Sequence, residues 1–208
     1  MATATQTETS ADTQAKVSYE EFLEWAGEDQ HLEWVEGEII PMSPISERHE
    51  DVSGFLKPLI RHFVEAHHLG VVRGEPLQMK PALHFPGRAP DIFFVATAHL
   101  DRLKKTYLEG PADLVVEIIS PESRARDRGD KFFEYEAAGI PEYWLLDPIR
   151  EQAEFYQLGA DGIYRPTALD EQGRYHSAVL PGLWLQEGWL WETPLPPLLS
   201  VLKAWELI

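Results

Sequence analysis

The chain of 208 residues is 44% hydrophobic and 25% charged, which predicts one globular domain with a sizeable core. It contains no cysteine, so disulfide scaffolds, thiolate zinc sites and cysteine nucleophiles are excluded. The net charge of −17 disfavours tight, non-specific binding of nucleic acid, but the acidity lies in the flanks: residues 1–51 carry 13 acidic and 2 basic side chains, whereas residues 52–150 carry 14 and 13.

Periodicity and turn residues predict alternating helices and strands. In chain order we expect a helix over 18–26, two strands within 31–41, a helix over 46–68, strands near 70–73, 75–80, 90–95 and 112–120, a helix over 123–138, strands over 142–147, 153–158, 162–168 and 176–185, and a short helix after Pro197. Ser18 and Glu21 form a capping box that opens the first helix. Pro58 falls inside the longest helical pattern and is expected to kink or interrupt it. This order predicts a mixed α/β or α+β domain.

The two ends are expected to differ from the core domain, which we place at residues 17–192. Residues 1–16 lack the basic start and the apolar stretch of a signal peptide and are interpreted as a disordered tail. No apolar run reaches the ~18 residues of a membrane helix, so we expect a cytoplasmic protein without a membrane partner. Residues 193–208 form an apolar helical extension. Its Trp205 and Leu207 could face a second subunit in a homodimer or pack on their own domain, and we prefer the second interpretation.

Glu117 stands in the apolar run from Leu114 to Ile119, which is typical of a buried central strand. Burying an unpaired charge is costly, so this carboxylate requires a proton, a cation or a metal ion. An ion pair with an arginine or a lysine, serving structure alone, is the alternative interpretation.

Asp91 follows Pro90 at the start of another apolar strand, a position where aspartate also commonly shapes a turn. If this strand lies beside that of Glu117, the two carboxylates form an oxygen-rich site suited to Mg²⁺ or Mn²⁺. A divalent ion there could lower the pKa of a water molecule and neutralise a phosphate.

Lys131 follows Glu117 by 14 residues, on the helix expected after its strand. Together with Arg124, Arg126 and Arg128 of the intervening segment, it forms the densest basic cluster of the chain. Asp127 and Lys131 are four residues apart, which is the spacing of a helix-surface ion pair worth ~0.3–0.5 kcal/mol. The alternative is a lysine directed at the metal site, where it holds a phosphate or the attacking water.

The segments that carry these residues resemble known nucleases. Pro90–Asp91 followed by Glu117 resembles the PD-(D/E)XK nuclease pattern. The longer segments are similar to the Uma-type family of bacterial restriction endonucleases, formerly classed as a domain of unknown function. They are RAPDIFFV (88–95), DLVVEIISPES (113–123), Asp127 with Lys131 and Tyr135, GIPEYWLLDP (139–148), LEWVEGEII (32–40), Met42–Pro44 and His49. The resemblance covers about residues 17–190 and is specific because these motifs occur together in this order.

The resemblance implies a restriction-endonuclease-like fold, with a central mixed β-sheet flanked by helices. It implies that Asp91 and Glu117 are metal ligands, with the backbone carbonyl of Ile118 as a third. The nuclease pattern places a lysine two residues after the glutamate, where this chain has Ile119. Lys131 would then replace that lysine from the following helix.

Three further residues are candidates for the catalytic site. Glu33 lies on the first hairpin, where an exposed strand charge is the alternative. His49 opens the long helix; in related nuclease folds the first helix often lends a polar residue to the metal site, and the alternative is a histidine facing solvent. Tyr135, one turn beyond Lys131, could donate a hydrogen bond to the site or pack in the core.

These observations lead us to interpret the chain as a hydrolase that uses Mg²⁺ or Mn²⁺, an endonuclease that cuts phosphodiester bonds in nucleic acid, most simply DNA. Asp91 and Glu117 would hold the metal, and Lys131 would orient the water or stabilise the phosphate charge. The alternative is a catalytically weak or inactive nuclease-fold module that binds a protein or a nucleic acid. The net charge and the absence of a lysine at position 119 favour that alternative.

Overall fold

The structure, a computed structural model, describes residues 16–26, 31–42, 44–121 and 123–208. Residues 1–15 of the expected disordered tail lie outside the described residues, as do Ser43 and Glu122 of the quoted motifs. Within the described ranges, no helix is both long enough and apolar enough to cross a membrane.

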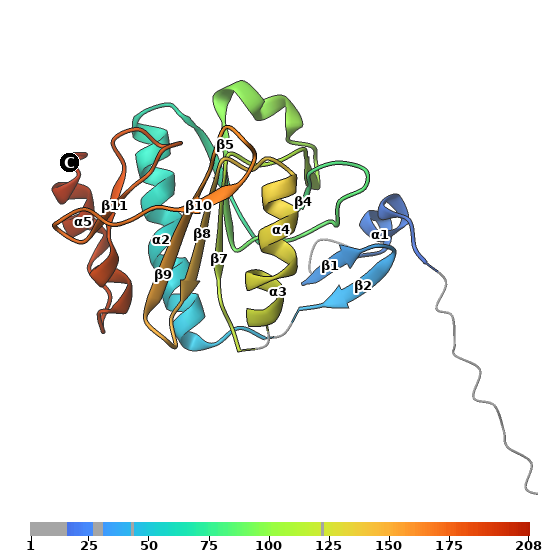
Figure 1. The fold of residues 1–208 in the computed structure, drawn as a ribbon, viewed down its shortest axis with the longest axis horizontal. Helices are drawn as coiled ribbons and strands as arrows, with labels where there is room; N and C mark the ends of the chain where they lie inside the picture. Colours follow the sequence, from blue (N-terminus) through green and yellow to red (C-terminus); the bar gives the residue numbers. More distant parts are fainter. Residues whose placement is uncertain (1–15, 27–30, 43, 122) are drawn as a thin grey trace, which may run out of the picture.

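A six-stranded mixed sheet forms the centre of the molecule, with strand order β10-β9-β8-β7-β5-β3 (Figure 1). Its strands are β3 (Gly70–Arg73), β5 (Ile92–Ala96), β7 (Leu114–Ile118), β8 (Glu142–Asp147), β9 (Gln152–Leu158) and β10 (Tyr164–Pro166). Strands β7 and β8 are parallel, and the other neighbours are antiparallel. A helical crossover joins the parallel pair, as parallel neighbours require. The predicted mixed α/β class with a central mixed sheet is confirmed.

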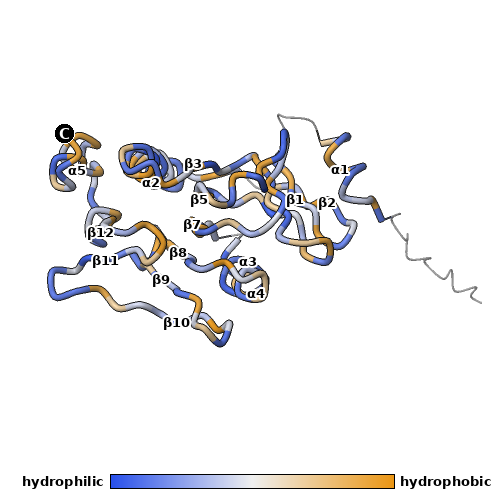
Figure 2. The backbone as a smooth tube through the Cα atoms, turned by 90° about the horizontal axis from the view of Figure 1, so that it is seen from above, coloured by the Kyte–Doolittle hydropathy of each residue, from blue (hydrophilic) through white to orange (hydrophobic). Residues whose placement is uncertain are grey.

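Helices cover both faces of this sheet (Figure 2). Helices α2 (Glu47–Ala66) and α5 (Leu198–Ala204) lie on one face, and α3 (Arg124–Arg128) and α4 (Asp130–Ala137) lie on the other. Side chains alternate along β7, so Val116 and Ile118 pack in the core under α2, whereas Val115 and Ile119 pack in the core under α4. The same alternation directs Glu117 toward α4.

Shorter elements surround the sheet. They are α1 (Tyr19–Ala26), the hairpin β1 (Leu32–Val35) and β2 (Glu38–Pro41), the parallel pair β4 (Gln78–Lys80) and β6 (Tyr107–Glu109), the pair β11 (Arg174–His176) and β12 (Trp184–Gln186), and the 3₁₀ helices η1 (Thr97–Arg102) and η2 (Glu187–Trp191). The predicted capping box is present, because Glu21 N–H donates to Ser18 Oγ and Ser18 N–H donates to Glu21 Oε2. Strand β6 was not predicted, since three residues carry too little alternation to be recognised.

Three predicted elements differ from the observed ones. The helix expected over 123–138 divides at Gly129, whose φ of −111° and ψ of −92° are not helical; glycine has the lowest helix propensity after proline. The strand expected over 176–185 is instead β11 and β12 joined by a loop. Pro58 does not interrupt α2, which runs through it for 20 residues, although proline offers no N–H to the carbonyl of Gly54.

The C-terminal helix packs on its own domain. Val201 and Leu202 of α5 are buried in the core under α2. The ring of Trp205 contacts that of Phe63 edge-to-face, with 5.6 Å between the centroids, and its indole N–H donates to the carbonyl oxygen of Trp184 at 2.8 Å. A homodimer stays a prediction, and these side chains are already used within the chain.

Replacing Gly54 by alanine is expected to raise the free energy of unfolding by about 0.5–1 kcal/mol, because glycine inside a helix costs about that much relative to alanine. A Cβ at position 54 would meet no atom within 4 Å, so the substitution adds no clash. Gly129→Ala is the contrasting variant, since its Cβ would lie 2.7 Å from the carbonyl oxygen of Ala125. Urea denaturation of both variants measures the difference, and a loss of stability in Gly54→Ala would contradict the open helix face.

Candidate active site

The register of β5 and β7 brings Asp91 beside Glu117. Ile92 pairs with Val116, so extending this antiparallel register by one residue places Asp91 opposite Glu117. Strand β5 begins only at Ile92, and the N–H of Ile118 donates instead to Asp91 Oδ2 at 2.5 Å. Asp91 is 7% exposed and Glu117 is 3% exposed. The two carboxylates predicted from the sequence therefore share one buried location.

Lys131 reaches Glu117 from the helix that covers this face of the sheet. Its Nζ lies 3.0 Å from Glu117 Oε2, 3.3 Å from Glu33 Oε1 and 3.3 Å from Asp127 Oδ1. Lys131 and Asp127 are each 1% exposed. The interpretation of these two residues as a helix-surface pair is therefore wrong: the ion pair exists, but it is part of a buried cluster of one ammonium and three carboxylates.

Tyr135 holds the second oxygen of Glu117. Its hydroxyl donates to Glu117 Oε1 at 2.7 Å, one helical turn beyond Lys131. The tyrosine side chain is fully buried and packs in the core under α4. Tyr135 thus does both things expected of it, and Glu117 is fixed at both oxygens.

Glu33 is fully buried, so the interpretation of this residue as an exposed strand charge is wrong. Arg88 Nη1 donates to Glu33 Oε2 at 2.9 Å, and the same guanidinium binds Glu134 through Nε and Nη2 at 2.8 and 2.6 Å. Burial by itself would raise the pKa of Glu33, but the positive charges of Lys131, Arg88 and Arg126 hold it below its ordinary value. Glu33 is therefore an ionised partner that holds the ammonium of Lys131 in place.

His49 contacts Asp91 from the first turn of α2. Its Nε2 lies 3.2 Å from Asp91 Oδ1, and its backbone N–H donates to the helix-capping Ser46 Oγ at 3.2 Å. The imidazole is buried, so the solvent-facing alternative is wrong. Burial lowers the pKa of His49, but the hydrogen bond and charge of Asp91 outweigh this and raise it above its ordinary value.

Glu75 is a member of this site that the sequence did not reveal. Burial, together with the charge and hydrogen bond of Asp91, raises the pKa of Glu75 to about 7. Glu75 Oε2 also lies 3.5 Å from His31 Nδ1. A single acid before Pro76 reads as an ordinary loop residue, and only the hydrogen bond from Glu75 N–H to the carbonyl of Pro90 places it beside Asp91.

The buried charges shift one another's titration. Burial raises the pKa of Glu117 well above its ordinary value; Asp127 and Asp91 add to this rise, and Lys131 opposes it. Burial alone would lower the pKa of Lys131, but Glu117, Glu33 and Asp127 outweigh it and raise that pKa well above its ordinary value. Lys131 therefore stays protonated as the positive centre of the cluster. Strongly shifted groups of this kind are frequent at functional sites.

A cavity of about 40 Å³ lies against these groups. Asp91, Glu117, Ile118, Lys131, His49 and Glu75 line it, together with Asp127 and Arg126. Glu33 does not line it and acts through Lys131. A larger cavity of about 370 Å³ adjoins it along α2 and shares His49, Glu75 and Asp91 with it.

The donors of this cavity fit a hard divalent cation. The expected ligands Asp91, Glu117 and Ile118 border the same space, and Nδ1 of the buried His49 has no hydrogen-bond partner among the described residues. Among the described residues, no three His, Asp or Glu side chains converge closely enough to hold an ion by themselves. Mg²⁺ suits such a site, because it usually keeps several waters and takes only one or two carboxylates from the protein.

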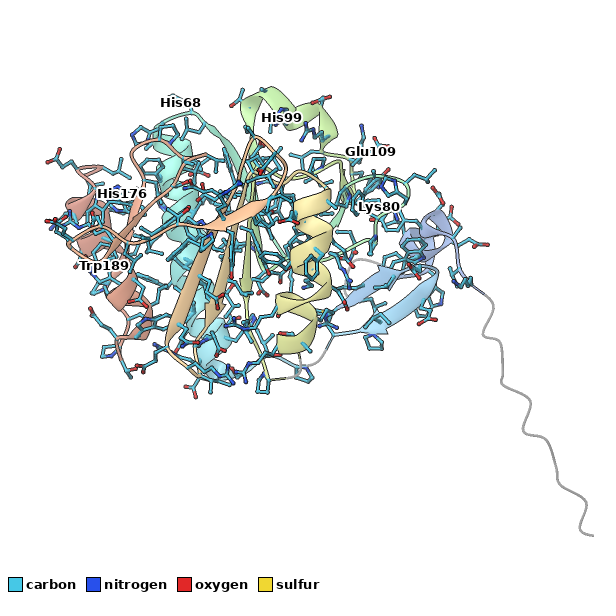
Figure 3. The ribbon with its side chains drawn as sticks, viewed as in Figure 1. His68, Lys80, His99, Glu109, His176 and Trp189 are labelled. Atoms are coloured by element: carbon cyan, nitrogen blue, oxygen red, sulfur yellow. The ribbon has the colours of Figure 1, made fainter. Side chains whose placement is uncertain are left out.

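His31 lines the same cavity as Glu75, whereas three other histidines pair elsewhere or lie apart from it. His68, His99 and His176 are found near the upper and left edges of the view in Figure 3. His99 Nδ1 lies 2.8 Å from Asp113 Oδ1, and His176 Nε2 lies 2.7 Å from Asp170 Oδ2. These pairs are local contacts of loops and strand ends.

Comparison with known proteins places these residues in a family. The family model Uma2, described as "Putative restriction endonuclease", matches residues 19–190. The chain belongs to the Uma2 family. The match spans Glu33, His49, Asp91, Glu117 and Lys131, and it confirms the family resemblance inferred from the motifs. Membership supports a nuclease, and hence a nucleic acid as substrate.

Two relatives of this Uma2 protein extend the comparison. The protein slr1290 of Synechocystis sp., described as an "Uncharacterized protein", is 26% identical over 150 residues, which cover 71% of this chain and 77% of the relative. A crystal structure described as "a putative nuclease belonging to DUF820" from Anabaena variabilis matches with a TM-score of 0.68 and 18% identity, over 84% of this chain and 97% of that chain. At this identity the structural match shows a shared fold.

Proposed function

We propose that this Uma2 protein is a Mg²⁺-dependent endonuclease that hydrolyses phosphodiester bonds in DNA. The observation that carries the proposal is the meeting of Asp91, Glu117 and Lys131 at one cavity, although they come from a strand start, a central strand and a crossover helix. Family membership gives the reaction class, and this site supplies the groups that such a reaction uses.

Asp91 and Glu117, with the backbone carbonyl of Ile118, are the residues that would hold Mg²⁺ or Mn²⁺. When bound, the cation would supply positive charge to the phosphate and lower the pKa of a water molecule. The carboxylates are already fixed in place: Asp91 by the N–H of Ile118, and Glu117 by Tyr135 and Lys131. Such preorganisation reduces the cost of arranging the site during the reaction.

Lys131 would stabilise the negative charge that develops on the phosphate, or orient the attacking water. Its ammonium borders the cavity and is held by Glu33 and Asp127, so it presents a fixed positive charge. Glu33, Tyr135 and His49 are positioning residues in this scheme, because each contacts a lysine or carboxylate of the site.

A second candidate function is a nuclease-fold module that binds a partner without cleaving it. The observation that favours it is the complete pairing of Glu117, whose two oxygens are occupied by Tyr135 and Lys131. A carboxylate satisfied in this way can serve stability alone. Metal binding separates the two candidates, since a binding module needs no divalent cation between Asp91 and Glu117.

Isothermal titration calorimetry with Mn²⁺ is the experiment that tests the proposal. Wild-type protein is expected to bind Mn²⁺, and Glu117→Gln, which keeps the size of the side chain and can still accept the hydrogen bond from Tyr135, is expected to lose that binding. Glu171→Gln, at an exposed turn, is the control for the same change of charge. Equal binding by wild type and Glu117→Gln would contradict the site, and no binding at millimolar Mn²⁺ would favour the binding module.

A further inference from the structure

The larger cavity beside the candidate active site is a groove along α2. Its helix wall includes Ser53, Lys57 and Arg61, which are spaced by four residues and so share one helix face. We call Ser53, Gly54, Lys57 and Arg61 the α2 groove. The cavity also reaches Asp91 and Glu75, so the groove opens directly onto the candidate active site.

Two positive side chains meet in the α2 groove. Lys57 is half-buried, and among the described residues its ammonium forms no hydrogen bond and no ion pair. Within the described part of the chain, the guanidinium of Arg61 donates only a long hydrogen bond, of 3.5 Å, to the carbonyl of Val72. Burial lowers the pKa of Lys57, and the positive charge of Arg61 lowers it further, so the two cations lie close enough to repel one another.

Gly54 keeps the groove open beside these cations. A Cβ there would meet no atom within 4 Å, so the helix surface at Gly54 is open. Two adjacent cations in an open groove attract an anion of extended shape. The chain as a whole carries a charge of −17, and Glu50, Glu75 and Asp91 line the same cavity, so an anionic ligand would be held at the helix face that carries Lys57 and Arg61.

We propose that the α2 groove binds the phosphodiester backbone of the substrate strand, next to the bond that is cut. This inference rests on the proposed function, because it assigns the substrate's path into the same site. Lys57 and Arg61 each contact a backbone phosphate, and such contacts position a strand without reading its sequence. The strand then passes from the groove to the cavity at Asp91 and Glu117.

A purely structural role for Lys57 would be to balance the negative charge of the nearby acidic side chains. Glu50, Glu75 and Asp91 all face the same cavity, and all three favour the charged form of Lys57. The two roles predict different effects of Lys57→Gln on DNA binding. Removing a positive charge should leave Mn²⁺ binding intact or stronger in either case, but only a phosphate contact makes DNA binding weaker and less dependent on salt.

The experiment is fluorescence anisotropy with a labelled single-stranded DNA of about 12 nucleotides, a length within the range that such grooves bind. The titrations are made in EDTA over a series of salt concentrations, so that the result does not depend on the metal site. Each lost phosphate contact should reduce the slope of log K against log salt by about 0.7 for a single strand. Lys57→Gln and Arg61→Gln are each expected to show this reduction with weaker binding.

Lys105→Gln is the matched control, since it removes one exposed charge from the loop between η1 and β6 and should leave the slope unchanged. Urea denaturation verifies that the variants fold; Arg61 is exposed, so its variant serves even if Lys57→Gln is destabilised. Unchanged slopes in both groove variants, or no DNA binding by wild type at low salt, would overturn the proposal that the α2 groove binds the DNA backbone. Failure of Mn²⁺ binding would instead overturn the proposed function and leave the DNA result standing.

Discussion

Asp91→Asn is expected to reduce metal-dependent DNA cleavage by about 10³-fold, because it removes a negative ligand of the cation and with it several kcal/mol of charge stabilisation. Asparagine keeps the size of the side chain and can still accept the hydrogen bond from the N–H of Ile118. Cleavage of supercoiled plasmid DNA in Mg²⁺ and in Mn²⁺ measures the effect.

The same variant should fold as well as wild type, or better. Burial, together with the charge and hydrogen bond of Asp91, raises the pKa of Glu75; replacing Asp91 by a neutral amide relieves the repulsion between the two acids. Asp101→Asn, at an exposed position on η1, is the control for the lost charge. Full cleavage activity in Asp91→Asn would contradict the assignment of Asp91 as a metal ligand. A loss of both activity and stability would indicate that Asp91 has a structural role.

The central part of the site could be predicted because local sequence carries its signal. An acid within an apolar strand requires a partner, so the burial of Glu117 follows from its neighbours alone. Asp91 follows from the same reasoning once the two strands are assumed to be adjacent, and the register confirms that arrangement. Lys131 required the family resemblance, because spacing alone also fits a helix-surface pair.

The rest of the site depends on contacts between distant segments, which no local pattern encodes. Glu33 alternates with apolar residues as an exposed strand charge would, and its partner Arg88 lies 55 residues away. Glu75 belongs to the site only because its loop binds the backbone before Asp91. In the fold, the break at Gly129 carries no clear local signal, because an isolated glycine is tolerated inside a helical pattern.

Lys131→Met is expected to lower the free energy of unfolding by about 3–5 kcal/mol, the usual cost of removing one partner from a buried ion cluster. Glu33 keeps Arg88 in this variant, but Glu117 and Asp127 lose the ammonium that lies within 3.3 Å of each. Urea denaturation at neutral pH measures the loss. Lys104→Met is the control: it breaks an exposed ion pair with Glu109 and should cost less than about 1 kcal/mol.

The loss of unfolding free energy in Lys131→Met should depend on pH. The direction of this dependence follows from the positive charge that is removed. Lys131 lowers the pKa of Glu117, so without it burial raises that pKa further above the ordinary value of about 4.3. In both proteins the folded state then binds this proton more tightly than the unfolded chain does, but the pKa is higher in the variant, so the stability of the variant falls further, relative to wild type, as pH rises through the range between the two folded pKa values of Glu117. A constant loss of stability across this range would mean that lost packing, and not the unpaired carboxylate, destabilises the variant.

Added Mn²⁺ should restore part of the stability of Lys131→Met at neutral pH, because a divalent cation can replace the missing positive charge. Such a recovery would connect the buried cluster to the metal site by a measurement that needs no substrate.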